Sequence, residues 1–155
     1  MRTLLILLLV TVCYAAYNLL VKVSTSHVDS VATPPIIATI CLQAAALSVS
    51  LVYLLYLTRQ SVSLALPGKA YAWAVGAGIC IGIAEVLYFY LFRGFEGEKP
   101  IAASSAIPFI VGGTIVIAVA VSHFIFRESL NTGQWVGIAL AFAGMMVLAV
   151  SSTQT

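Results

Sequence analysis

Charged residues are scarce in this sequence, at 8% of 155 residues, whereas hydrophobic residues make up 62%. A soluble domain is typically about 25% charged, so water is not the main solvent of this chain. The apolar runs continue around whole helices, which requires lipid or protein on every side of them. The composition therefore predicts an all-α integral membrane protein, in contact with a lipid bilayer.

The sequence lacks the residues that several classes of function require. Lysine and arginine total seven and are not clustered, so we expect no nucleic acid as a partner. The three cysteines, Cys13, Cys41 and Cys80, are too few and too widely spaced for a disulfide framework or a zinc site, and we expect no metal. Gly-rich phosphate loops, HExxH and GxSxG motifs are absent, so we expect neither an enzyme nor a bound cofactor.

Apolar runs separated by polar punctuation divide the chain into five parts, each near or above the ~20 residues that cross a hydrocarbon core. These parts predict five transmembrane helices, at about residues 3–23, 33–57, 70–92, 101–126 and 133–151. The chain is too short for two domains, and we expect residues 1–155 to form a single five-helix transmembrane domain.

The first apolar run has two readings. Arg2, a short apolar core and the small residues Ala15 and Ala16 resemble a cleaved secretory signal. The apolar character resumes through residues 17–23, however, which makes the run long enough to span the membrane. We therefore expect a retained first helix.

Five spans place the two termini on opposite sides of the membrane. With the N-terminus in the cytoplasm, four basic residues lie inside and three outside, which favours this orientation by one residue and permits insertion both ways. The inside set is Arg2, Arg59, Lys69 and Arg127, and the outside set is Lys22, Arg93 and Lys99. We expect the bacterial plasma (inner) membrane as the location.

A carboxyl group interrupts the third span. Glu85 lies about seven residues, or roughly 10 Å, before Phe92 near the helix end, at a depth where an isolated carboxylate is costly. It must face other helices or water, or stay protonated, and such groups commonly mark ion or substrate paths. The alternative is a protonated side chain that hydrogen-bonds a neighbouring helix. Gly78 and Gly82 share its face and permit another helix to approach closely.

Other polar or aromatic side chains are candidates for the same site. Tyr88 follows Glu85 by three residues and can line a cavity, whereas Tyr90 and Phe92 fit an interfacial aromatic belt better. Tyr14 and Asn18 belong to a polar stripe of the first span, and Gln43 lies within the second. These groups either line a cavity or form hydrogen bonds between helices. We take Glu85, Tyr14, Asn18, Tyr88 and Gln43 as the candidate substrate- and proton-binding residues.

The last span carries small residues along one face, with Gly133, Gly137 and Gly144 among them. The GxxxG spacing of the first two is typical of close helix packing. The stripe packs within the chain or forms a dimer seam, and we favour the seam. Asn131 or Thr132 is expected to cap this helix.

The order of these residues resembles EamA-like members of the drug/metabolite transporter superfamily. The resemblance covers the chain in outline: Pro108 matches a proline midway in the fourth helix, Glu128 a glutamate that closes it, and Gly137 and Gly144 the fifth helix. Gln43 departs from the pattern, since many members have arginine at about this place.

The resemblance implies a transporter built from one EamA-like repeat. Most such proteins contain two five-helix repeats of inverted topology, with the substrate between them near the bilayer midplane. A lone repeat needs an oppositely inserted copy of itself, as an antiparallel homodimer, or a related membrane subunit.

Two functions follow as hypotheses. The leading one is a transporter or flippase-like subunit that moves a small metabolite, lipophilic cation or amphiphile by alternating access as a dimer. Its rival is a non-transporting accessory or scaffold subunit of a larger complex, in which Glu85 is structural. A membrane enzyme is the weakest option, because no nucleophile and base are visible together.

Overall fold

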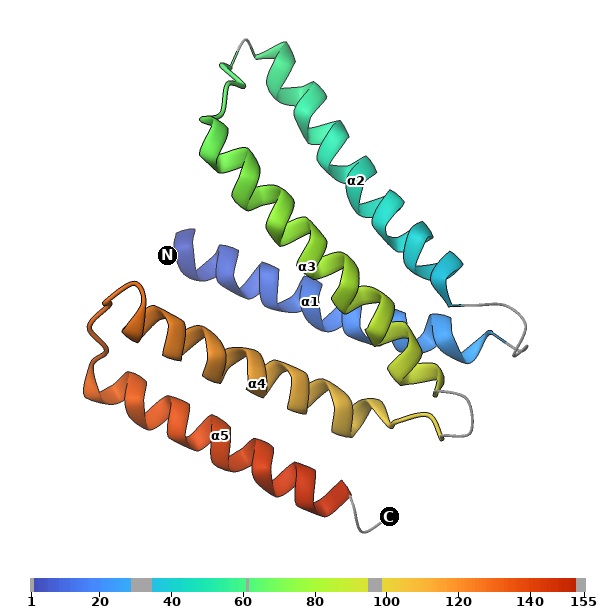
Figure 1. Ribbon diagram of the computed structural model, residues 1–155, viewed down its shortest axis with the longest axis vertical. Helices are drawn as coiled ribbons and strands as arrows, with labels where there is room; N and C mark the ends of the chain where they lie inside the picture. The colour runs from blue at the N-terminus through green and yellow to red at the C-terminus, as the bar shows by residue number, and fades with distance from the viewer. Residues whose placement is uncertain (1, 29–34, 61, 95–98, 153–155) are drawn as a thin grey trace. The chain divides into compact units, whose positions relative to one another are not determined.

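The computed structural model describes residues 2–28, 35–60, 62–94 and 99–152, and all five elements in this part of the chain are α-helices (Figure 1). In chain order they are α1 (Arg2–Ser26), α2 (Ile36–Arg59), α3 (Gly68–Arg93), α4 (Ala103–Phe124) and α5 (Thr132–Ser152). A helix satisfies its own backbone hydrogen bonds, which is what a segment surrounded by lipid requires. The predicted all-α membrane fold with five helices is confirmed.

Four of the helices, α1 to α4, have 22 to 26 residues and are apolar enough to cross a membrane. The fifth, α5, has 21 residues and carries a shorter apolar stretch, Thr132–Leu148. Most of their large apolar side chains are exposed within the chain; Trp73, for example, retains 81% of its accessible surface and Leu140 retains 69%. Such surfaces are suited to lipid and to other membrane helices, not to water.

The helix boundaries differ from the predicted spans by one to three residues where they can be compared. The predicted start of the second span, residue 33, lies outside the described residues, and the described helix begins at Ile36. The fourth helix begins at Ala103, two residues later than predicted. It then continues to Phe124 with Pro108 inside it.

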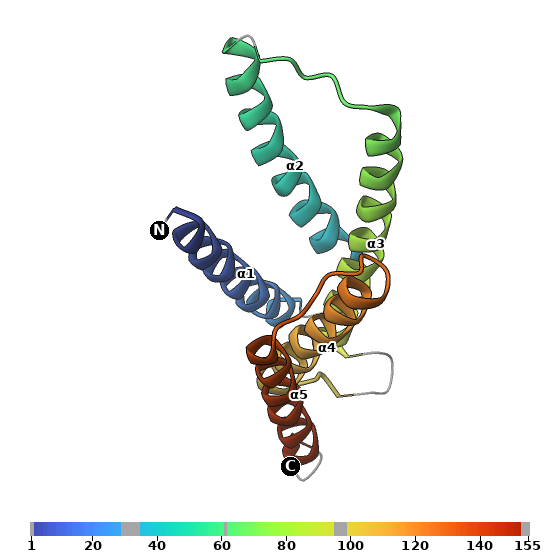
Figure 2. The same cartoon turned by 90° about the vertical axis from the view of Figure 1, so that its left-hand side faces the viewer.

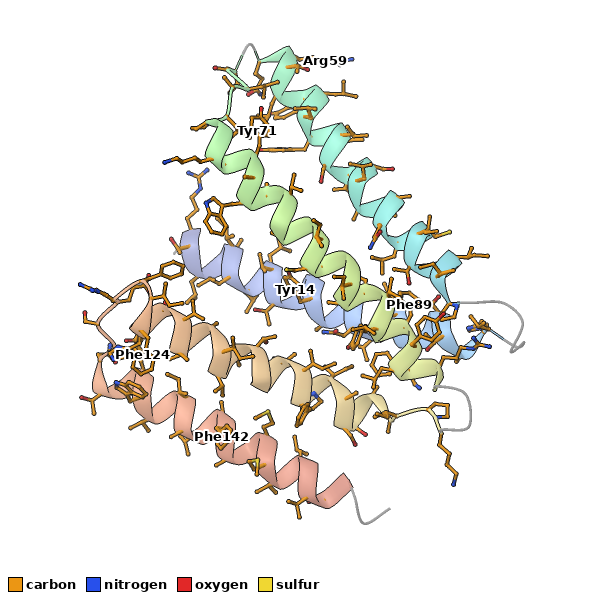
Figure 3. All side chains as sticks on the ribbon, viewed as in Figure 1. Tyr14, Arg59, Tyr71, Phe89, Phe124 and Phe142 are labelled. Carbon is orange, nitrogen blue, oxygen red and sulfur yellow. The ribbon has the colours of Figure 1, made fainter. Side chains whose placement is uncertain are left out.

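The chain divides into two compact units, residues 1–100 with α1, α2 and α3, and residues 101–155 with α4 and α5. A single domain that joins all five helices therefore stays a prediction. In the first unit α3 packs against both α1 and α2, and α2 and α3 diverge toward the loop that joins them (Figure 2). Arg59 and Tyr71 mark this loop end of the pair in Figure 3.

The best-packed part of the first unit lies where the C-terminal halves of α1 and α3 meet. Phe89 and Phe92 of α3 and Val21 of α1 retain at most 2% of their accessible surface. Figure 3 labels Phe89 within this group of side chains. The buried carboxyl Glu85 lies one helical turn before Phe89 on α3. The chain therefore concentrates its tight packing beside its intramembrane carboxyl.

The second unit is an antiparallel pair of helices joined by a short turn, and α4 and α5 lie side by side in Figures 1 and 2. The turn is tied by hydrogen bonds: Ser122 donates its hydroxyl to the Glu128 carboxylate and accepts the Glu128 backbone N–H at 3.0 Å. Asn131 caps α5, since its side chain accepts the Gln134 N–H and Gln134 accepts the Asn131 N–H, both at 2.8 Å. Of the two expected caps, Asn131 is the one observed.

Candidate functional site

The intramembrane carboxyl of Glu85 is buried between helices. It lies on α3 and retains 6% of its accessible surface. The hydroxyl of Tyr17, on α1, donates a hydrogen bond to Glu85 Oε2. Among the described residues this is its one hydrogen bond. A buried carboxyl needs such a partner, because burying a polar group away from water without a hydrogen bond costs roughly several kcal/mol of free energy.

A second hydrogen bond joins the same two helices in the opposite sense. Tyr88, one turn after Glu85 on α3, donates its hydroxyl to Asn18 Oδ1 at 2.7 Å. Asn18 follows Tyr17 directly on α1. In these two bonds each helix donates once and accepts once. We refer to Tyr17, Asn18, Glu85 and Tyr88 as the α1–α3 cluster.

The ring of Tyr17 is held on two sides. It stacks on Tyr88, with ring centroids 6.2 Å apart and planes 26° apart. Tyr14, one turn earlier on α1, meets it edge-on at 6.4 Å and 87°. Such offset and edge-to-face pairs are favourable arrangements of aromatic rings. They favour the ring orientation in which the Tyr17 hydroxyl meets Glu85.

Side chains near the C-terminal end of α3 pack against the α1–α3 cluster. Tyr88 packs on Phe92 with ring centroids 4.6 Å apart. Lys22 of α1 donates to the backbone carbonyl of Phe92 at 3.4 Å, and its ammonium lies 5.3 Å from the ring centroid. A lysine at this place satisfies one of the last carbonyls of the helix. The assignment of Phe92 to an exposed aromatic belt was wrong, because the ring is 1% exposed and packs inside the protein.

Gln43 approaches α3 from the other side, on α2. Its Nε2 atom lies 3.6 Å from where a Cβ of Gly82 would be, one turn of α3 before Glu85. That distance is an ordinary van der Waals contact, so a small side chain would also fit at Gly82. Nothing described lies within 4 Å of the corresponding position at Gly78. Of the two glycines, Gly82 therefore lies beside a side chain of α2 and Gly78 does not.

Of the five candidate residues, three meet directly or through Tyr17: Glu85, Asn18 and Tyr88. Tyr14 adjoins them through its ring but remains 65% exposed, and Gln43 lies on a different helix. Tyr17 was not among the predicted residues, although it belongs to the α1–α3 cluster. Its position three residues after Tyr14 places it near the same helix face, which is a signal that was available.

The glycine stripe of α5 does not face α4. Nothing described lies within 4 Å of a Cβ built at Gly137 or Gly144, and only the side chain of Asn131 approaches that of Gly133. The close contact between the two helices instead joins Gly112 of α4 to Met145 of α5. The stripe is therefore an open surface of the second unit.

The chemistry open to the α1–α3 cluster is proton exchange and cation binding. A carboxyl with hydroxyl and amide neighbours accepts a proton or pairs with a positive group. Within the described ranges no three His, Cys, Asp or Glu side chains gather as a metal site would require. The three cysteines are free and exposed.

Comparison with known proteins gives the class of the molecule. The model of the EamA-like transporter family matches residues 1–150. No curated protein and no solved structure matches the chain. The family is one of membrane transporters rather than enzymes, and its match covers nearly the whole sequence, from the cluster on α1 and α3 to the hairpin of α4 and α5. The chain therefore belongs to the EamA-like transporter family.

Proposed function

We propose that this membrane transporter moves a small metabolite, a lipophilic cation or an amphiphile by alternating access, as a dimer of five-helix repeats. The observation that carries the proposal is the buried carboxyl of Glu85, hydrogen-bonded to Tyr17 in a helix long and apolar enough to cross a membrane. Keeping an ionisable group there is expensive, and in transporters such groups bind the coupling ion or the substrate. Family membership supports transport as the general activity.

In this mechanism Glu85 binds a proton in one step and a cationic group of the substrate in another. The two compete for the same carboxyl, so loading substrate on one side of the membrane releases the proton there. Tyr88 and Asn18, which are hydrogen-bonded to each other, line the substrate site beside Glu85 in this mechanism. Tyr14 and Gln43 are placed to contact a substrate that extends along α1 or toward α2, since both side chains are exposed within the chain.

The second repeat comes from an antiparallel copy of the chain or from a related membrane subunit. A five-helix repeat with an inverted partner recreates the arrangement of transporters that bind substrate at the midplane between repeats. The open glycine stripe of α5, at Gly133, Gly137 and Gly144, supports its use as the dimer seam. Residues 1–155 act as one five-helix domain in this dimer. The near-equal distribution of basic residues permits both orientations in the bacterial plasma membrane.

The test is transport by purified protein in proteoliposomes. A dye inside the vesicles reports proton movement when quaternary ammonium or phosphonium cations, small amines or lysophospholipids are added outside. We expect proton movement with at least one of these probes, and its loss in Glu85→Gln, which keeps the shape of the side chain. Glu128→Gln is the matched control, because Glu128 is exposed in the α4–α5 turn.

Undiminished proton movement in Glu85→Gln would remove Glu85 from the mechanism. Failure of every probe, together with stoichiometric co-purification of larger membrane partners, would instead favour the accessory-subunit hypothesis.

A further inference from the structure

The hydrogen bond between Tyr17 and Glu85 does more than satisfy a buried group, because of how Tyr17 itself is held. Its ring contacts those of Tyr14 and Tyr88, and its hydroxyl meets Glu85 Oε2. The bond from Tyr88 to Asn18 joins α1 and α3 on the same turn. The Glu85 carboxyl is thereby hydrogen-bonded to a side chain whose own orientation is supported by two ring contacts.

A phenol suits a carboxyl that changes its protonation state. Its hydroxyl donates to an ionised carboxylate and accepts from a protonated acid. Tyr17 can therefore partner Glu85 Oε2 in both protonation states. Its bond to the ionised form is the stronger one, because hydrogen bonds to charged acceptors are roughly twice as strong as neutral ones.

We propose that Tyr17 is the positioning residue of the transport site: it holds the Glu85 carboxyl in one orientation through proton binding and release. The inference rests on the proposed function of Glu85, and it adds a residue that acts through Glu85 without touching the transported molecule. Positioning of this kind increases affinity, because the carboxyl does not have to be ordered when the ligand binds.

The remaining groups near Glu85 leave Tyr17 as its polar partner. From α1 the titratable neighbours are Tyr14, Tyr17 and, further toward the helix end, Lys22, whose ammonium is placed at the Phe92 carbonyl. On α3 itself the neighbour is Tyr88, which donates to Asn18. From α2 the neutral amide of Gln43 lies beside Gly82, one turn before Glu85.

The experiment uses Tyr17→Phe, which keeps the ring and removes only the hydroxyl. Infrared spectra of the full chain in lipid nanodiscs are recorded across a pH titration, and the protonated carboxyl band of Glu85 is assigned as the band lost in Glu85→Gln. In Tyr17→Phe we expect this band to move to higher wavenumber, because the acid loses its hydrogen-bond partner.

Tyr56→Phe is the matched control. Tyr56 stacks on Tyr53 of the same helix at 6.1 Å and 28°, nearly the geometry of Tyr17 on Tyr88, but it lies on α2 away from the cluster. The Glu85 band of this variant should superimpose on that of the unchanged protein. The band shift tests the hydrogen bond itself, and the transport kinetics below separate positioning from a merely structural role.

Transport measurements on the two variants distinguish the role of Tyr17 from the proposed function of Glu85. With a probe cation that the unchanged protein moves, Tyr17→Phe should raise KM about tenfold and leave kcat within a factor of two. Identical Glu85 bands and identical KM in Tyr17→Phe and the unchanged protein would overturn the role of Tyr17, even if Glu85→Gln abolishes transport. Full transport by Glu85→Gln would overturn the proposed function, and the transport role of Tyr17 with it.

Discussion

The contact between Gly112 and Met145 gives a stability prediction with a control one residue away. A Cβ added at Gly112 would lie 2.5 Å from Met145 Sδ, 3.1 Å from its Cγ and 3.2 Å from its Cβ. Optimal carbon–carbon contacts are about 3.5–4.0 Å, so Met145 must withdraw along its whole length or α5 must shift. Overpacking of this kind costs about 1–3 kcal/mol. At Gly113 a Cβ meets nothing described within 4 Å.

Both substitutions to alanine gain the same helix propensity, about 1 kcal/mol, so it cancels between them. Gly112→Ala should therefore be less stable than Gly113→Ala by about 1–3 kcal/mol. The assay is unfolding in mixed micelles with increasing amounts of a denaturing detergent. Unfolding is monitored by the fluorescence of Trp135 on α5 in a Trp73→Phe background. Adding Met145→Ala to Gly112→Ala should recover most of the difference. Equal stability of the two alanine variants would refute the contact.

Three further changes test other parts of the molecule. Asn131→Ala removes the α5 cap and should cost about 1 kcal/mol in the same unfolding assay, and an unchanged midpoint would contradict the cap. A double-mutant cycle of Tyr88→Phe and Asn18→Leu should give a coupling energy of about 0.6 kcal/mol, typical of hydrogen bonds between membrane helices; additivity would contradict the bond. Gly137→Leu should weaken self-association in lipid, measured by energy transfer between labelled copies, and undiminished transfer would exclude the α5 seam.

The helices were predictable from the sequence because the bilayer itself specifies them. A hydrocarbon core needs about 20 apolar residues per span, so apolar length and polar punctuation locate each helix to within a few residues. Glu85 stands out as a candidate for the same reason, since charge at that depth is conspicuous, and the structure shows the side chain buried. Both predictions depend only on the position of a residue along its own helix.

The partners of each side chain were harder to predict, because they depend on which helix faces meet. Tyr17 and Glu85 are 68 residues apart in sequence, and nothing in the sequence of either span specifies their pairing. Phe92 looked interfacial because it lies near a helix end, but α1 crosses there and buries it. The α4–α5 contact at Gly112 was likewise hidden, since the more regular glycine spacing lies on the open face of α5.

The central claim is that this chain is one repeat of a transporter completed by an inverted partner. The most direct measurement is the topology of the full chain in its native membrane, with a reporter at each end that distinguishes the two sides. We expect each terminus to be found on both sides, or one orientation to co-purify with a related subunit of opposite orientation. A single fixed orientation without such a partner would contradict it.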